Sequence, residues 1–154
     1  KYEQIRDATN IPLRLIHADA KIGNILFNKS DNRPCCVIDY DTVMPGYFFS
    51  DLGDMVRTMC CTSDENETEL SKLSFRKDYY EALLMGYSKA VALTPREKEL
   101  IHFSGLFMTY MQALRFLTDY FNGDIYYAVS YKEHNLLRAK NQCRLLELME
   151  SELS

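Results

Sequence analysis

Four polar residues interrupt an apolar run near the start of the sequence, in LIHADAKIGNILF at residues 15–27. They form the pattern His17-x-Asp19-x-Lys21-x-x-Asn24. Polar groups placed inside an apolar segment cost free energy unless they are paired or put to use. A carboxylate can orient or deprotonate a hydroxyl, an ammonium can neutralise a phosphoryl group, and an amide oxygen can bind a hard cation. The spacing therefore predicts a loop between two strands that aims these groups at one point.

Two further acidic pieces follow, Ile-Asp-Tyr-Asp at 38–41 and Asp-Leu-Gly-Asp at 51–54. Asp39 comes directly after a predicted strand, so it can reach the same point as Asn24. One carboxylate and one amide oxygen, without His or Cys, form a hard-oxygen set that suits Mg²⁺. Together with Asp19, these residues supply what phosphoryl transfer requires: positioning, a metal clamp and an oriented nucleophile.

Simpler structural interpretations exist for several of these residues. We expect His17 to support the loop through hydrogen bonds and to take no part in proton transfer. Asp51 and Asp54 are expected to cap the helix that begins there, with one of them also fixing the backbone of the loop. Arg57 stands three residues after Asp54 and can pair with it. For Asp41 two interpretations have equal weight: a contact with substrate or a second metal ion, and a turn residue.

The composition excludes some classes of partner. The chain has 154 residues and a net charge of -4, which argues against broad electrostatic binding to nucleic acid or an anionic membrane. No apolar run reaches the roughly 20 residues of a membrane helix, and no signal peptide is visible. The cysteine count is odd and contains no C-x-x-C pair, so we expect reduced, buried thiols in a cytoplasmic protein. These cysteines are Cys35, Cys36, Cys60, Cys61 and Cys143.

The first third of the chain predicts a small β ribbon. Residues 1–12 resemble the tail of an element that began upstream. Residues 13–17, 25–27 and 35–38 are short apolar runs, and the turn-rich segment 28–34 should close a hairpin between the last two. Three short strands so close in sequence predict one small ribbon.

The remainder predicts helices, at 51–61, at 70–92, after Thr94 and at about 130–150, with an acidic, solvated loop at 62–69. Thr94-Pro95-Arg96-Glu97 is a strong helix start, with a capping box and Pro at the first helical position. The helix that follows is broadly apolar, which predicts a central buried helix ended by Asn-Gly-Asp at 122–124. In the last helix we expect these residues to face inward: Leu136, Leu137, Cys143, Leu146 and Met149.

Two residues outside the acidic pieces are candidates for substrate binding. Arg115 lies on the predicted central helix among apolar neighbours, where a guanidinium would suit a hydroxyl-rich substrate; an internal ion pair is an equal alternative. Tyr126 follows the break at 122–124 and can line an acceptor pocket, together with Tyr127.

The motif H-x-D-x-K-x-x-N resembles the catalytic loop of protein kinases, H-R-D-x-K-x-x-N. The absence of Arg after His17, and Asp-Tyr-Asp at 39–41 in place of D-F-G, make the chain more similar to the aminoglycoside phosphotransferase and choline kinase group of small-molecule kinases. The string IDYDTVMPG at 38–46, followed by DLGD at 51–54, most resembles the N-acetylhexosamine 1-kinase branch.

The resemblance implies a role for each matching residue. Asp19 corresponds to the catalytic Asp that acts on the acceptor hydroxyl. Lys21 corresponds to the lysine that contacts the γ-phosphate of ATP. Asn24 and Asp39 correspond to the Mg²⁺ ligands, and His17 to a supporting loop residue.

The resemblance also implies a mostly α fold with a small β ribbon (α+β), the C-terminal catalytic lobe of a protein-kinase-like fold, over residues 1–154. Such a kinase needs a lid over the nucleotide phosphates and a strand lysine before the catalytic loop. The six glycines form no Gly-rich loop. We therefore expect the N-terminal nucleotide lobe to be absent from this chain, and the isolated fragment to be inactive.

The leading hypothesis is thus an ATP- and Mg²⁺-dependent kinase whose small-molecule acceptor is a hydroxyl, such as the anomeric hydroxyl of an N-acetylhexosamine. Choline, homoserine or an aminoglycoside are alternative acceptors. An alternative of another class is a non-catalytic kinase-like binding module, against which the intact Asp19, Asn24 and Asp39 argue.

Overall fold

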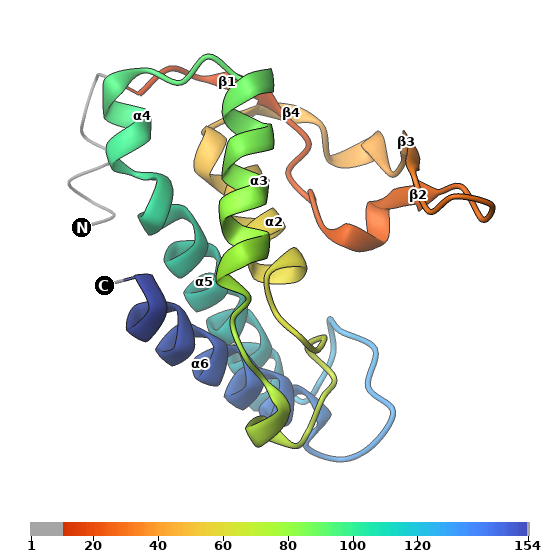
Figure 1. The fold of residues 1–154 in the computed structure, drawn as a ribbon. Coiled ribbons are helices and arrows are strands. Elements are labelled where there is room, and N and C mark those ends of the chain that lie inside the picture. The colour runs from red at the N-terminus through yellow and green to blue at the C-terminus, as the bar shows by residue number, and fades with distance from the viewer. Residues whose placement is uncertain (1–10, 154) are drawn as a thin grey trace.

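Helices make up most of the molecule in a computed structural model, which describes residues 11–153 (Figure 1). The helices are α2 (Phe48–Met59), α3 (Lys77–Ala90), α4 (Pro95–Glu99), α5 (Ile101–Phe121) and α6 (His134–Leu153). Three short 3-10 turns are η1 (Ile22–Asn24), η2 (Tyr40–Thr42) and η3 (Leu70–Lys72). The strands are β1 (Arg14–Ile16), β2 (Ile25–Phe27), β3 (Pro34–Val37) and β4 (Met44–Gly46). The expectation for residues 1–12 lies almost entirely outside the described residues.

The core forms where α5 packs against α6 on one side and α2 on the other (Figure 1). Phe48, Leu52 and Val56 of α2 are fully buried there, as is Met149 of α6. Burying each such side chain contributes about 1.5–3 kcal/mol. The α2–α5 pair is therefore the framework on which the polar segments must be mounted.

A glycine lets α2 and α5 approach closely. A Cβ atom at Gly53 would collide with the carbonyl oxygen of Ser104 and the side chain of Met108, both on α5. Only glycine fits this crossing without movement of a neighbouring helix. Gly53, part of the Asp-Leu-Gly-Asp sequence, thus has a packing function.

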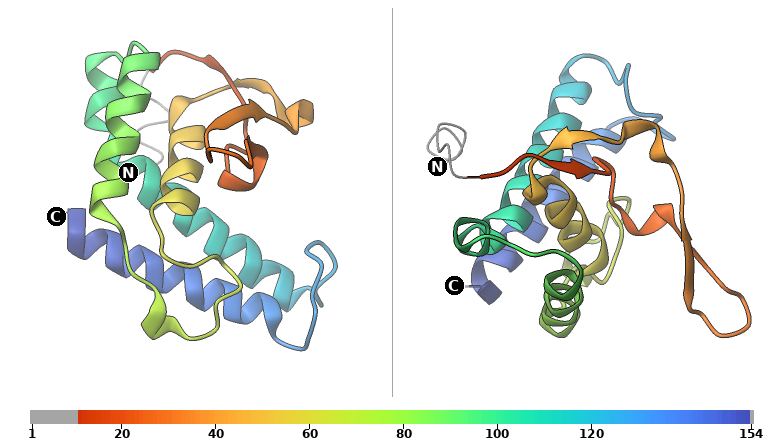
Figure 2. Two further views of the ribbon diagram at one scale, coloured as in Figure 1. Left: turned by 45° about the vertical axis from the view of Figure 1, so that its right-hand side comes forward. Right: turned by 90° about the horizontal axis from the view of Figure 1, so that it is seen from above.

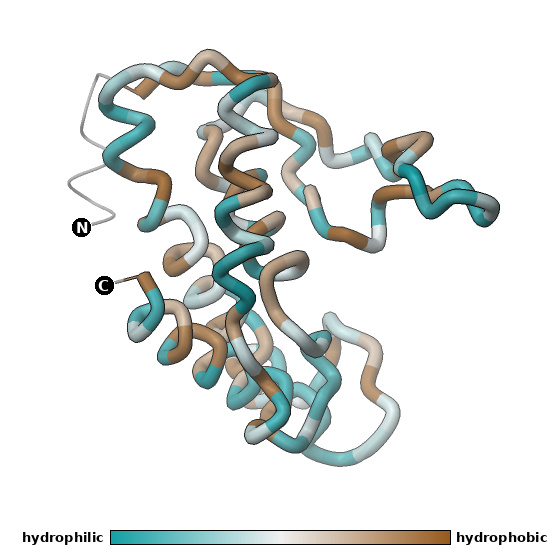
Figure 3. Tube along the Cα trace, in the orientation of Figure 1, coloured by the Kyte–Doolittle hydropathy of each residue, from teal (hydrophilic) through white to brown (hydrophobic). Residues whose placement is uncertain are grey.

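The strands form two separate two-stranded antiparallel sheets, so the single three-stranded ribbon was a wrong prediction. β1 pairs with β4, with Arg14 opposite Gly46, and β2 pairs with β3. We did not predict β4 because Pro45 and Gly46 are uncommon inside strands. The β2–β3 hairpin projects from the helices, and its turn is hydrophilic (Figures 2 and 3).

Two helix starts differ from prediction. α2 begins at Phe48, three residues early, so Asp51 lies in the first helical turn and does not precede it. α3 begins at Lys77, seven residues after the predicted start at 70. Leu73 and Phe75 before it are buried in an extended segment, and Phe75 bridges to Cys61. Their two-residue spacing was hidden among apolar residues that also fit a helical period.

The predicted capping box is confirmed. The Thr94 side chain accepts the Glu97 N–H at 3.2 Å, and Glu97 accepts the Thr94 N–H at 2.7 Å. The helix that follows is interrupted at Leu100, between α4 and α5, and ends as expected at Asn122. α5 is only partly buried: Tyr110, Leu114 and Phe121 remain exposed.

The inward face of α6 is more polar than predicted. Asn135, Asn141 and Gln142 are buried, whereas Cys143 is exposed. Asn141 donates to the carbonyl oxygens of Asp64 and Glu67, at 3.1 and 2.9 Å. The 62–69 loop is therefore fastened to α6, a pairing that residue polarity alone does not reveal.

The prediction of buried cysteines holds for Cys60 and Cys61 and is wrong for the other three: Cys35 and Cys36 are exposed on the projecting hairpin, and Cys143 is exposed on α6. Within residues 11–153, no helix has both the length and the apolar character needed to cross a bilayer.

Candidate active site

Loop 17–24 connects β1 to β2 and includes η1. Three of its four predicted polar residues meet at one carboxylate, that of Asp19. Asp19 Oδ2 accepts hydrogen bonds from Lys21 Nζ at 2.6 Å and from Asn24 Nδ2 at 3.0 Å. Asn24 Nδ2 also donates to the Asp19 carbonyl oxygen at 2.9 Å. The amide nitrogen of buried Asn24 is thereby committed to Asp19, so its oxygen is the atom available to accept from a donor or bind a cation.

The backbone of loop 17–24 is held by Asp51 of α2. Its two carboxylate oxygens accept the N–H groups of His17 and Ala18, each at 2.8 Å. Ala18 has a φ of 65°, a left-handed conformation that costs a non-glycine residue about 1–2 kcal/mol. The prediction that Asp51 and Asp54 cap this helix is wrong, because the N-cap is Tyr47, which makes no side-chain capping bond, and Asp54 lies in the middle of α2. The prediction that one of the two fixes the loop backbone is confirmed for Asp51.

His17 makes its contacts with the segment after β3. Its Nε2 lies 3.0 Å from the Ile38 carbonyl oxygen, and its ring lies 5.5 Å from that of Tyr40. Thr42 Oγ1 donates to the His17 carbonyl oxygen at 2.6 Å. Nδ1 is buried and has no hydrogen-bond partner within residues 11–153. None of these contacts is with Asp19, and a supporting role for His17 stays a prediction.

Asp39 stands beside loop 17–24 because the Ile38 N–H donates to the Asn24 carbonyl oxygen at 3.0 Å. Its φ of 69° is left-handed, which Asp tolerates better than most residues. The pKa of Asp39 is raised, first by the hydrogen bond and charge of Asp41 and further by Asp19, while Lys21 opposes the shift. The carboxylates of Asp39 and Asp41 therefore repel each other, and a bound cation would relieve that repulsion.

This donor set fits Mg²⁺. Mg²⁺ is usually bound by one or two carboxylates together with water and substrate phosphates, and seldom by a cage of protein ligands alone. Residues 11–153 contain no cluster of three or more His, Cys, Asp or Glu side chains placed to hold a metal. Asn24 and Asp39 are the residues that would hold it.

Asp19 is ionised at neutral pH. Burial alone would raise its pKa, but the hydrogen bonds from Lys21 and Asn24, with the charge of Lys21, outweigh burial and hold the pKa below its usual value. The same ion pair raises the pKa of Lys21, to which the charges of Asp39 and Asp54 add. A carboxylate with a lowered pKa accepts a hydrogen bond well but is a weak base.

Asp54 lies inside α2, and its support of the site stays a prediction. It is buried and pairs with Arg57, whose Nε lies 3.1 Å from Oδ1, as predicted from their spacing. Burial raises the pKa of Asp54, and Arg57 opposes the shift. Sequence reasoning missed Thr58, whose Oγ1 accepts the Ile22 N–H at 3.2 Å and donates to the Asp54 carbonyl oxygen at 2.8 Å.

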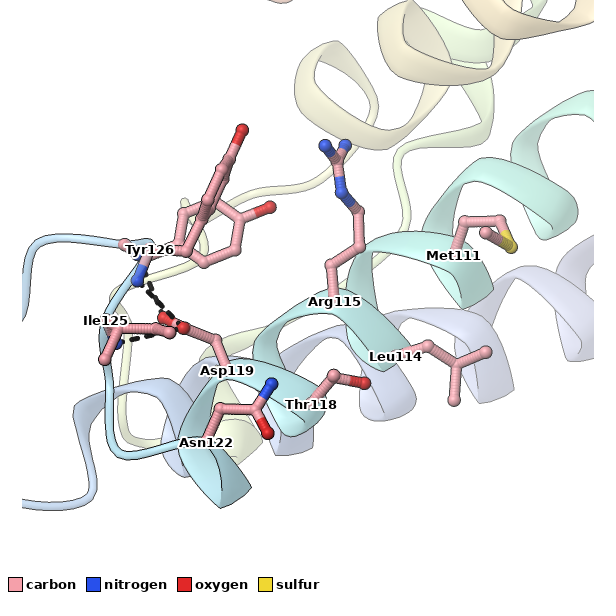
Figure 4. Close-up of a pocket in the computed structure, with 9 residues that line it drawn as sticks. Met111, Leu114, Arg115, Thr118, Asp119, Asn122, Ile125 and Tyr126 are labelled. Atoms are coloured by element: carbon pink, nitrogen blue, oxygen red, sulfur yellow. Dashed lines mark hydrogen bonds between the residues drawn. The ribbon is translucent and has the colours of Figure 1, made fainter.

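A second candidate region lies at the end of α5, in a pocket of about 500 Å³ (Figure 4). Its lining contains both Arg115 and Tyr126, and no residue of loop 17–24. Within residues 11–153, Arg115 makes no hydrogen bond or ion pair, so the internal ion pair considered for it is not formed there. Figure 4 shows the Arg115 and Tyr126 side chains pointing to the same side of α5.

Sequence reasoning also missed Asp119, which lines this pocket. Its Oδ1 accepts the N–H groups of Ile125 and Tyr126 at 3.1 and 2.9 Å, and its Oδ2 accepts the Tyr127 N–H and Asn135 Nδ2, each at 2.9 Å. One signal was present in the sequence. An acidic residue in the last turn of a helix opposes the helix dipole, so it needs local donors.

A comparison with protein families agrees with the motifs of loop 17–24. A model of the phosphotransferase enzyme family, APH, matches residues 3–100, which is more than half of the 154 residues. The match includes loop 17–24, Asp39, Asp51 and Asp54, and it ends before the pocket that contains Arg115. The chain therefore belongs to the phosphotransferase enzyme family.

Proposed function

We propose that this chain is the catalytic lobe of an ATP- and Mg²⁺-dependent small-molecule kinase with a protein-kinase-like fold, which works with an N-terminal nucleotide lobe. The observation that carries the proposal is the convergence of Lys21 and Asn24 on the Asp19 carboxylate, with Asp39 beside them. Family membership supports the phosphotransferase chemistry.

Asp19 would orient the acceptor hydroxyl. Its lowered pKa keeps it charged at neutral pH, so it can accept a hydrogen bond from the hydroxyl and fix the direction of attack. Phosphoryl transfer through a loose transition state depends mainly on positioning and charge stabilisation. A weak base held in one place suits that requirement.

Lys21, together with Mg²⁺ held by Asn24 and Asp39, would neutralise the negative charge of the phosphates. Lys21 has a raised pKa and remains cationic, and its ammonium can move from Asp19 to an incoming phosphoryl oxygen. Asn24 and Asp39 would hold Mg²⁺, which supplies neutralisation of the phosphate charge when bound. Asp51, Thr58 and the Ile38–Asn24 backbone bond keep these side chains in place.

The acceptor pocket is proposed to be the one lined by Arg115 and Tyr126. Its volume of about 500 Å³ falls in the range of small-molecule sites. Its one carboxylate, Asp119, has both oxygens occupied by N–H donors, whereas Arg115 has no partner within residues 11–153. Such a pocket disfavours cationic acceptors such as choline or an aminoglycoside and favours a neutral, hydroxyl-rich one.

We therefore favour a sugar acceptor, specifically the anomeric hydroxyl of an N-acetylhexosamine. The string at 38–46 and the Asp-Leu-Gly-Asp sequence at 51–54 support this choice by resemblance, and the positive charge of Arg115 argues against the cationic alternatives.

The test is a panel of acceptors offered to the full-length protein with ATP and Mg²⁺, scored for the position of the new phosphate. The panel holds N-acetylglucosamine, N-acetylgalactosamine, choline, homoserine and an aminoglycoside. We expect a 1-phosphate on an N-acetylhexosamine. Phosphorylation of a cationic acceptor alone would refute the acceptor assignment. Binding of acceptor or nucleotide without any turnover would refute the enzyme and leave a binding module.

A further inference from the structure

Three consecutive backbone N–H groups, those of Ile125, Tyr126 and Tyr127, end on one carboxylate, that of Asp119 (Figure 4). The side chain of Asn135 on α6 adds a fourth bond at 2.9 Å. These four donors occupy both oxygens, so Asp119 offers nothing further to a ligand. The role of Asp119 therefore depends on the segment that it binds, residues 125–127.

Without those donors, the position of Asp119 would destabilise an ionised carboxylate. Asp119 is buried in the last turn of α5, where the helix dipole is negative and disfavours an acid. Burial alone would raise its pKa, yet the N–H donors of Tyr127, Tyr126 and Ile125 outweigh burial and hold the pKa below the usual value. Asp119 and the loop thus stabilise each other, and neither arrangement is favourable alone.

The held segment carries two tyrosines over the face of α5 that bears Arg115. Tyr127 packs back on the helix, with its ring 4.8 Å from that of Phe116 and its hydroxyl 3.4 Å from Gln112 Nε2. Tyr126 remains 74% exposed, and both tyrosines line the pocket. Arg115 lies one turn before Asp119 on α5, so the carboxylate that holds the Tyr126 backbone is close in sequence to the other lining residue, Arg115.

The loop is secured from α6 as well. Asn135 Nδ2 donates to Asp124 Oδ1 at 2.9 Å, in addition to Asp119. Arg138 Nη1 donates to Asn135 Oδ1 and to the Ala128 carbonyl oxygen, each at 3.1 Å. Asp119 is thus the point where α5, α6 and the 122–133 loop meet.

We propose that Asp119 is a positioning residue that sets the shape of the acceptor pocket by fixing Tyr126 opposite Arg115. This inference rests on the proposed function for its kinetic part, because the pocket is proposed to bind the acceptor. Asp119 itself touches no reacting atom. Its loss should therefore weaken acceptor binding and leave phosphoryl transfer from a saturated complex nearly intact.

The test compares Asp119→Asn with Asp124→Asn in the full-length protein. Asn at 119 keeps one oxygen but presents an N–H₂ to two of the four donors, because each carboxylate oxygen accepts two of them, so hydrogen bonds to a charged acceptor are lost. Asp124→Asn removes the same charge from the same loop, keeps the oxygen that accepts from Asn135, and suits the φ of 59° at that position. We expect the acceptor KM to rise about tenfold or more in Asp119→Asn, with kcat and the KM for ATP within about twofold. The control should be within about twofold throughout.

Amide hydrogen exchange gives a readout that needs no activity. In Asp119→Asn the N–H groups of Ile125, Tyr126 and Tyr127 should exchange faster, while those of His17 and Ala18 keep their protection, which also shows that the variant is folded. If no acceptor is phosphorylated by the unchanged protein, the proposed function fails but this measurement still tests the positioning. Unchanged exchange at 125–127, a fall in kcat without a rise in acceptor KM, or an equal effect of Asp124→Asn would each overturn the proposal.

Discussion

The two candidate regions, loop 17–24 and the pocket at the end of α5, are held by the same kind of contact. In each, one aspartate on a helix collects consecutive backbone N–H groups of a neighbouring loop: Asp51 of α2 holds residues 17 and 18, and Asp119 of α5 holds residues 125–127. In each, the held loop carries the side chains expected to meet substrate. Packing of α2 on α5, through Gly53, joins the two anchors.

The anchors differ in their position on the helix dipole. Asp51 lies in the first turn of α2, where a carboxylate is favoured, and two loop donors suffice. Asp119 lies in the last turn of α5, where a carboxylate is disfavoured, and it has four donors. Asp119 thus holds more N–H groups of the 122–133 loop than Asp51 holds of loop 17–24. Both loops contain left-handed residues, Ala18 in one and Asp124 and Glu133 in the other.

The largest effect is expected at loop 17–24, which we propose carries the catalytic residues. Asp19→Ala in the full-length protein should lower kcat by roughly 10²–10⁴, because the oriented acceptor hydroxyl loses its partner. The acceptor KM should change little, in contrast to Asp119→Asn. Steady-state kinetics measures this, with Asp31→Ala on the hairpin turn as a control of normal activity. Near-normal turnover in Asp19→Ala would remove Asp19 from the mechanism.

A substitution of Asp51 tests whether loop 17–24 is held like the 122–133 loop but affects kcat, where Asp119→Asn is expected to affect the acceptor KM. Asp51→Ala leaves two N–H groups of loop 17–24 without their acceptor, at about 1–3 kcal/mol for each that stays unsatisfied. We expect kcat to fall about 10–100-fold and the unfolding temperature to drop. Asp78→Ala is the matched control, since Asp78 is an exposed acid in the first turn of α3. A rise in acceptor KM with kcat intact would abolish the contrast between the two anchors.

The contacts of loop 17–24 were easier to predict from the sequence than those of the 122–133 loop, for a physical reason. Asp19, Lys21 and Asn24 lie within six positions, so spacing alone brings them together, and they do converge in the structure. Their catalytic roles stay predictions. The helical composition, the β2–β3 hairpin and the Thr94 capping box were equally local signals, and they were predictable.

What escaped prediction depends on contacts between distant segments. Strand β4 pairs with β1 across about 30 residues, and its Pro45 argues against a strand when only the sequence is considered. The buried polar face of α6 matches loops that end 11 to 77 residues away, as for Asn135 with Asp124 and Asn141 with Asp64. Asp119 escaped prediction for a different reason: its backbone partners lie only 6 to 8 residues away, but they become donors to one point only after the chain turns at Asn122.

The helix crossing between the two anchors should be sensitive to one methyl group. Gly53→Ala places a Cβ against Ser104 and Met108 of α5, and overpacking of this kind destabilises by about 1–3 kcal/mol. Gly86→Ala is the control: it lies inside α3 with no atom within 4 Å of an added Cβ, and should stabilise by about 0.5–1 kcal/mol. Thermal unfolding measures both. Equal shifts of the same sign would show that the close approach of α2 and α5 has no energetic consequence.

The smallest effect concerns a third carboxylate, Glu97 of α4, which holds the strand that leads into loop 17–24. Its two oxygens bind the Arg14 guanidinium of β1 at 2.7 and 2.8 Å. The hydrogen bond from Arg14 is the main reason that the pKa of Glu97 is lowered, and burial partly opposes it. A carboxylate whose pKa is lower in the folded state contributes stability above its unfolded pKa and loses that contribution as the pH falls through its folded pKa.

Glu97→Gln should therefore destabilise by about 1 kcal/mol at pH 7, and its unfolding temperature should approach that of the unchanged protein as the pH falls below about 4. Arg14 stays charged throughout this range, so the change follows Glu97 alone. Glu99→Gln is the matched control, because its pair with Arg96 at 2.6 Å is exposed and such pairs contribute about 0–1 kcal/mol. A Glu97→Gln effect that is independent of pH would mean that lost packing or capping, and not the ion pair with Arg14, stabilises the approach to loop 17–24.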